Sequence, residues 1–125
     1  MVKTLVSLIC AFVVVTAGAI FEDYFVHKQF EDFSAVLDVL YEKIEDKTAT
    51  EDDVLAAQNN WLLKKKNLHA FIPHTEIKEI DLWLSETVTL VRDEMWTDAI
   101  SKVEVLKELA EQIPKTFELR AQNIL

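Results

Sequence analysis

The chain has few of the residues that make turns and only one cysteine. Its 125 residues include one glycine and two prolines. Sandwiches, barrels and α/β enzymes need many turns and glycine-rich loops, so this composition argues against them and favours a few long helices. The single cysteine, Cys10, excludes an intrachain disulfide. An apolar core must therefore stabilise the fold.

Acidic residues outnumber basic residues after the N-terminal apolar run. All 22 acidic residues lie at or after Glu22. The whole chain carries −9, and Lys3 contributes +1 before that point, so residues 22–125 carry −10. Phosphate backbones and anionic lipid headgroups repel such a surface. We therefore expect no nucleic acid partner.

The common catalytic and ligand-binding motifs are missing. The only glycine, Gly18, lies in an apolar run, so the chain has no glycine-rich phosphate loop. No spacing suggests a nucleophile beside a histidine base, and the E-x-x-H element of di-iron bundles does not occur. The acidic stretch 46–53 lacks the glycine of a calcium loop. We expect no enzyme activity and no cofactor.

The histidines give the one hint of a metal site. His69 and His74 lie close in sequence, with Glu76 just beyond, and His27 lies near the apolar run. Two imidazoles and a carboxylate can bind a metal ion. No H-x-x-x-H or H-E-x-x-H spacing places them on one helical face, however. The favoured interpretation is structural, with His74 capping a helix or packing against a tryptophan, and we assign no metal ligand.

An apolar run occupies the N-terminus. Thr4 to Phe21 are 18 residues without a charge. As a helix they would span roughly 27 Å, close to the hydrocarbon thickness of a bilayer. With Lys3 on one side and acidic residues on the other, the N-terminus is expected in the cytoplasm. We predict that 1–21 is a membrane anchor and 22–125 an extracytoplasmic helical domain of a single-pass protein.

A cleaved signal peptide is the competing interpretation. Ala17-Gly18-Ala19 has the small-x-small form of a processing site, and cleavage after Ala19 would release a secreted chain. The run is longer than the roughly 7–15 residues of a typical signal core, which favours the anchor. Both interpretations place residues 22–125 outside the cytoplasm.

Apolar residues at helical spacing predict four further helical segments. The first, about 22–46, continues from the apolar run. Thr50 is the expected N-cap of the second, about 51–71. The third follows Thr75. The stripe that defines the first consists of Val26, Phe30, Phe33, Leu37, Leu40 and Ile44.

The fourth segment, about 96–112, is expected to end before Pro114 and to leave residues 115–125 as a docking tail. Short connections favour antiparallel neighbours. The predicted fold is therefore all-α, an N-terminal transmembrane helix followed by an antiparallel four-helix bundle. Two Ile-Pro pairs, at 72–73 and 113–114, suggest the alternative of two stacked helical hairpins. Lys64 to Lys66 are expected on a solvated face, and the three tryptophans in the core or between helices.

Two short segments carry a resemblance to a known family. They are the pattern Phe71-Ile72-x-His74-x-Glu76-Ile77 and the ending Asn123-Ile124-Leu125. With the lysine-started apolar anchor, they make the chain resemble the domain of unknown function 4363 family over essentially its whole length. The resemblance implies an anchored protein of the bacterial envelope, and it implies no activity, cofactor or catalytic residue.

These observations together predict a non-enzymatic accessory or interaction protein, tethered by Thr4 to Phe21, with a protein partner such as an integral membrane protein. The alternative is a ligand-sensing or metal-binding helical ectodomain. In an antiparallel bundle, the link between the second and third helices and the C-terminus both lie at the membrane-proximal end. The predicted partner contacts are Phe71, His74, Glu76, Asn123, Ile124 and Leu125.

Overall fold

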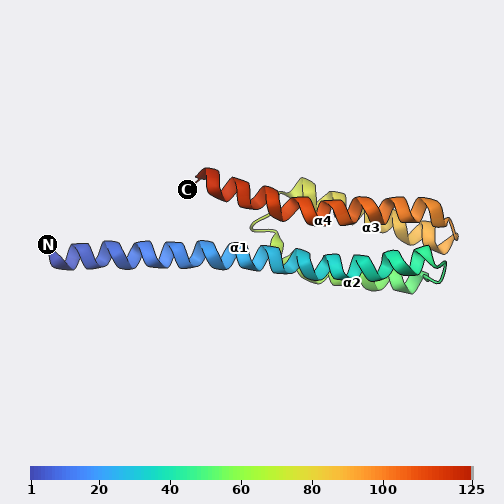
Figure 1. Cartoon of the computed structure of the whole chain (residues 1–125), viewed down its shortest axis with the longest axis horizontal. Helices are drawn as coiled ribbons and strands as arrows, with labels where there is room; N and C mark the ends of the chain where they lie inside the picture. The colour runs from blue at the N-terminus through green and yellow to red at the C-terminus, as the bar shows by residue number, and fades with distance from the viewer. Residues whose placement is uncertain (125) are drawn as a thin grey trace.

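The computed structural model describes residues 1–124, with side chains described as far as Arg120. In this part of the chain there are four helices, α1 (Val2–Glu45), α2 (Glu51–Leu68), α3 (His74–Arg92) and α4 (Trp96–Ile124). The helices form a bundle from which the N-terminal half of α1 projects (Figure 1). The all-α prediction is confirmed.

Pairs of charged side chains show the relative direction of α1 and α4. On α1 and α4, His27 pairs with Glu118 and Asp38 with Lys107. Residue numbers therefore rise along α1 while they fall along α4, and the two helices are antiparallel. Each of α1 and α3 packs against both α2 and α4. This ring of contacts is a closed bundle, because two stacked hairpins would leave α1 and α4 apart.

The predicted apolar stripe of α1 forms the centre of the core. All six of its residues are buried. The indole of Trp61 on α2 lies among them, with ring centroids 6.0 Å from Phe30 and 5.0 Å from Phe33. Trp83 and Trp96 are partly buried against the edge of the same core. The periodicity of the sequence therefore identified the buried face of α1 correctly.

Thr50 caps α2 as predicted. Its hydroxyl accepts a hydrogen bond from the Asp53 N–H at 3.3 Å, and Asp53 Oδ2 accepts one from the Thr50 N–H at 2.8 Å. Asp53 Oδ1 also lies 3.0 Å from Lys43 Nζ on α1. The pKa of Asp53 lies below its ordinary value of 3.8. The largest cause is the hydrogen bond from the Thr50 backbone N–H, and the next is the hydrogen bond from Lys43. This capping box fixes both the start of α2 and its contact with α1.

We expect Thr50→Ala to lower the free energy of unfolding by about 1 kcal/mol, because the first turn of α2 loses an acceptor. Thr75→Ala, at an exposed position in the first turn of α3, is the matched control and should change it by less than about 0.5 kcal/mol. Urea unfolding of the full chain in mild detergent measures both. Equal losses in the two variants would contradict the assigned cap.

The capping box also makes the stability of the bundle depend on pH. Because the folded pKa of Asp53 is lowered, the stabilisation that its carboxylate gives the folded chain is complete above pH 3.8 and is lost as the pH falls through the folded pKa.

The predicted end of the fourth helix is wrong. α4 continues through Pro114 to Ile124, so residues 115–124 are helical and do not form a separate tail. A proline inside a helix lacks an N–H donor and costs about 3 kcal/mol. Pro114 is buried, Ile113 is buried beside it, and Phe117 packs against the core. Burial of this apolar face offsets the cost of the proline. The second helix was also predicted too long, since α2 ends at Leu68.

The apolar N-terminal part of α1 is not buried by the bundle. The large side chains from Leu5 to Val15 are exposed. In the described part of the chain, α1 is the one helix long and apolar enough to cross a membrane, and its most apolar window is entirely unburied. Figure 1 shows this segment continuing the helix that enters the bundle. A single-pass span and an N-terminal signal sequence both fit it.

Candidate functional site

The connection between α2 and α3 packs at the end of the bundle nearest the apolar segment. The ring centroid of Phe71 lies 6.1 Å from that of Phe25 on α1 and 6.2 Å from that of Phe117 on α4. Phe25 in turn stacks on Phe21 at 6.2 Å. We call the end defined by these four phenylalanines the aromatic end. It brings the 71–77 segment, the last turns of α4 and the start of the bundle together, as the predicted topology requires.

Three of the six predicted partner contacts have described side chains. Phe71 is half-buried in the aromatic end and therefore has a structural role. His74 is exposed and is the first residue of α3; the N-cap is Pro73, and no side chain caps this helix. Glu76 lies 3.7 Å from Arg120 on α4. His74 is thus the residue of the three whose side chain is most open to a partner.

The other three predicted contacts are at the C-terminus. Asn123 and Ile124 lie in the last turn of α4. Their side chains, and all of Leu125, lie outside the described residues. Figure 1 shows the end of α4 reaching past the α2–α3 connection, back along the N-terminal half of α1. The backbone of this segment is therefore at the aromatic end.

The suggested metal ligands His69, His74 and Glu76 do not meet at one point. The two imidazoles lie near each other, with ring centroids 6.1 Å apart. Among the described side chains, the set of three whose ligand atoms converge is a different one, Asp23, His27 and Glu118. The D-x-x-x-H spacing of the first two could have drawn attention to them in the sequence. Glu118 could not be found in this way, since it comes from α4.

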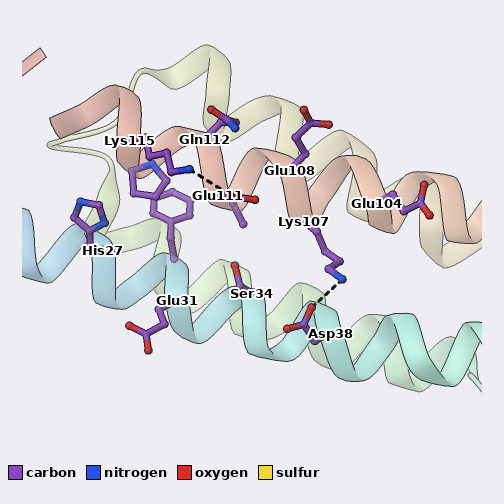
Figure 2. Close-up of a pocket in the computed structure, with 13 residues that line it drawn as sticks. His27, Glu31, Ser34, Asp38, Glu104, Lys107, Glu108, Glu111, Gln112 and Lys115 are labelled. Carbon is purple, nitrogen blue, oxygen red and sulfur yellow. Dashed lines mark hydrogen bonds and ion pairs between the residues drawn. The ribbon is translucent and has the colours of Figure 1, made fainter. Parts of the chain in front are cut away.

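A groove of about 760 Å³ runs between α1 and α4, with His27 at one end of it (Figure 2). Its two lysines are paired with acidic side chains, Lys107 with Asp38 at 3.0 Å and Lys115 with Glu111 at 3.2 Å. The remaining charged lining residues are acidic, Glu31, Glu104 and Glu108. The groove is therefore net negative and attracts cationic rather than anionic ligands.

The groove does not hold a catalytic pair of the serine–histidine type. Ser34 and His27 both line it. They lie seven residues apart on one helix, which separates them by about 10 Å along the axis. A general base must lie within hydrogen-bonding reach of its nucleophile, about 3 Å. The arrangement can bind a ligand, but this serine has no base beside it.

The lysine run of α2 was predicted on a solvated face, and this is wrong for two of its three residues. Lys64 Nζ lies 3.8 Å from Asp32 on α1. Lys65 Nζ lies 2.7 Å from Asp81 Oδ2 on α3, and the other oxygen of Asp81 accepts a hydrogen bond from the buried Trp61 indole. Only Lys66 is exposed. The lysine run therefore forms ion pairs from α2 to both α1 and α3.

Comparison with protein-family models matches residues 20–124 to the family described as "Domain of unknown function (DUF4363)". The match covers the whole bundle and begins at Ile20, near the end of the apolar run. No curated protein and no solved structure matches the chain.

Proposed function

The chain belongs to the DUF4363 family, and we propose that it is a non-enzymatic interaction protein that a membrane anchor tethers in the bacterial envelope. The observation that carries the proposal is the continuity of α1. Its exposed apolar half and its core-forming half are one helix, Val2–Glu45. A continuous helix fixes the distance and orientation of the bundle relative to the apolar segment. The bundle would thus stand in a defined position on the membrane.

The aromatic end would lie just above the bilayer surface. Phe25, which contacts Phe71, comes four residues after Phe21, so it lies about 6 Å further along the helix axis. Phe21 and Tyr24 are both 66% exposed. Tyrosine and tryptophan are typical of the interface between hydrocarbon and water, and an exposed aromatic pair at this height fits such a belt. Residues 71–77, here called the His74 corner, belong to this end. A partner at the His74 corner would therefore meet the chain at the membrane surface, which favours an integral membrane protein.

Charge supports the same arrangement. The N-terminal flank of the apolar run carries Lys3, and the other flank begins with two acidic residues, which favours an external bundle. With a net charge of −10 on residues 22–125, the bundle is repelled by anionic headgroups. It would stand away from the lipid and leave its surface free for a protein partner.

A photo-crosslinking amino acid at position 74 of the full chain should capture a partner in native membranes. The matched control is position 97, because Thr97 is also exposed but lies at the opposite end of the bundle. The 19-residue α3 separates the two ends by about 27 Å. Mass spectrometry should identify the same membrane protein in repeated experiments at 74 and not at 97. Equal capture at both positions, or no capture at 74, would contradict the proposed contact.

The second candidate is a ligand-binding helical domain, which the acidic groove of Figure 2 favours. Its floor is built from α1 and α4, so a bound cationic ligand would change the contact between these two helices. Ligand binding of this kind would persist without a protein partner. The crosslinking experiment separates the two functions, because it tests position 74, which lies outside the groove.

A further inference from the structure

We propose that Asp23, His27 and Glu118 form a binding site for a divalent transition-metal ion, with Zn²⁺ as the best chemical fit. The site lies at the aromatic end and would join the start of the bundle on α1 to the last turns of α4. It is independent of the protein partner proposed above, and it uses none of the residues of the His74 corner.

The distances match those between ligands of one ion. His27 Nε2 lies 3.3 Å from Asp23 Oδ1 and 3.6 Å from Glu118 Oε2. All three ligand atoms lie within 4.8 Å of one another. Ligands about 2.0–2.1 Å from a tetrahedral Zn²⁺ are roughly 3.3 Å apart. Both carboxylates are partly exposed, so small side-chain rotations can bring the three atoms onto one ion.

One of the three ligand atoms is left without a hydrogen bond. Asp23 Oδ1 is shielded from solvent and has no hydrogen-bond partner among the described side chains, although it lies 3.3 Å from His27 Nε2. An oxygen that is shielded from water and lacks a partner is unfavourable, although the Asp23 side chain as a whole is 45% exposed. A cation bound between the three side chains would remove this cost.

The charges near the site also favour a bound cation. The basic side chains near the site are bound to other carboxylates, Lys28 to Asp32, Lys115 to Glu111 and Arg120 to Glu76. Two carboxylates that are brought together repel each other unless a positive charge lies between them. A bound metal ion can supply that charge.

The choice of metal follows from the ligand types. Ca²⁺ and Mg²⁺ prefer oxygen ligands, whereas an imidazole with two carboxylates suits Zn²⁺. Asp23 and His27 are four residues apart, which places them on one face of α1. Glu118 supplies the third ligand from α4, beyond the buried Pro114. Water would complete a tetrahedral site. Bound metal would thereby hold the segment after the proline against α1.

The test is Zn²⁺ binding to the untagged full chain in detergent after removal of metal with a chelator. Competition with a chromophoric zinc indicator should show one ion per chain and no competition by Mg²⁺. We expect His27→Ala to weaken binding by about 100-fold or more, and Glu118→Gln by at least about tenfold. Glu118→Gln keeps the side-chain size and hence the fold. The matched controls, His69→Ala and Glu79→Gln, should stay within about twofold of wild type, because both side chains are exposed and lie outside the three-ligand set.

The thermal midpoint provides a second readout. Zn²⁺ at a concentration that saturates the wild type should raise it in wild type and in both control variants, should raise it less in Glu118→Gln, and should raise it least in His27→Ala. Absence of stoichiometric Zn²⁺ binding overturns the proposal. Binding that survives His27→Ala but is lost in His69→Ala also overturns it, since the ion would then lie at the His69–His74 pair.

Discussion

Replacing Phe33 with aspartate should unfold the helical bundle. The Phe33 side chain is completely buried, and its ring lies 5.0 Å from that of Trp61. Aspartate at this position would lose the aromatic contact and bury a carboxylate without a partner. The expected cost is several kcal/mol, comparable to the whole stability of a small domain, about 5–15 kcal/mol. The measurement is the loss of cooperative urea unfolding and of protease resistance in residues 26–120 of the full chain.

The matched control for Phe33→Asp is Lys66→Glu, an exposed change that should shift the free energy of unfolding by less than about 0.5 kcal/mol. Lys65→Glu would not serve, because it places a second carboxylate beside the partly buried Asp81 and should give an intermediate loss. If Phe33→Asp and Lys66→Glu behave alike, the assignment of buried and exposed faces is wrong.

The sequence predicts best those features that depend on neighbours along the chain. The stripe from Val26 to Ile44 repeats at the helical period, and a helix with such a stripe must bury it somewhere. The cap at Thr50 depends on a hydrogen bond to the residue three positions on, Asp53, which is a local event. The class of the fold, the number of helices and the start of α2 could therefore be predicted.

Pro114 shows where local rules fail. A proline inside a helix is unfavourable, and the sequence gives no sign of what the following residues contact. In the structure, Ile113 and Pro114 are buried and Phe117 reaches the ring of Phe71. These contacts involve α1 and the α2–α3 connection, far away in sequence. Tertiary packing outweighs the local preference, and the helix continues.

The same error hid part of the candidate sites. Because the segment after Pro114 was expected to be a tail, Glu118 could not be placed on a helix facing His27. The lysine run was misjudged for a related reason, since Asp32 and Asp81 lie on helices whose rotation toward α2 the sequence does not fix. A pair of charges becomes predictable only after the faces of both helices are known.

Deleting residues 2–19 should move the protein from the membrane fraction to the soluble fraction while the bundle stays folded. The apolar window of α1 is unburied, and the first buried core residue is Val26, so the bundle loses no buried side chain. The apolar segment is long enough to cross the hydrocarbon layer, so its removal eliminates the anchor. Carbonate-washed membranes and cooperative unfolding measure the two effects. Loss of folding in the deleted chain would show that the segment also stabilises the bundle.

A double substitution separates the anchor from a cleaved signal. Ala17→Leu together with Ala19→Leu removes the small residues that a processing enzyme needs and keeps the segment apolar. An anchored wild-type chain starts before Ile20 by intact mass, and the double variant should appear in the same fraction. A reporter active only outside the cytoplasm, fused after Leu125, should be active in both and inactive in the deleted chain. Release of a wild-type chain that starts at Ile20, with the double variant held in the membrane, would contradict the anchor and establish secretion.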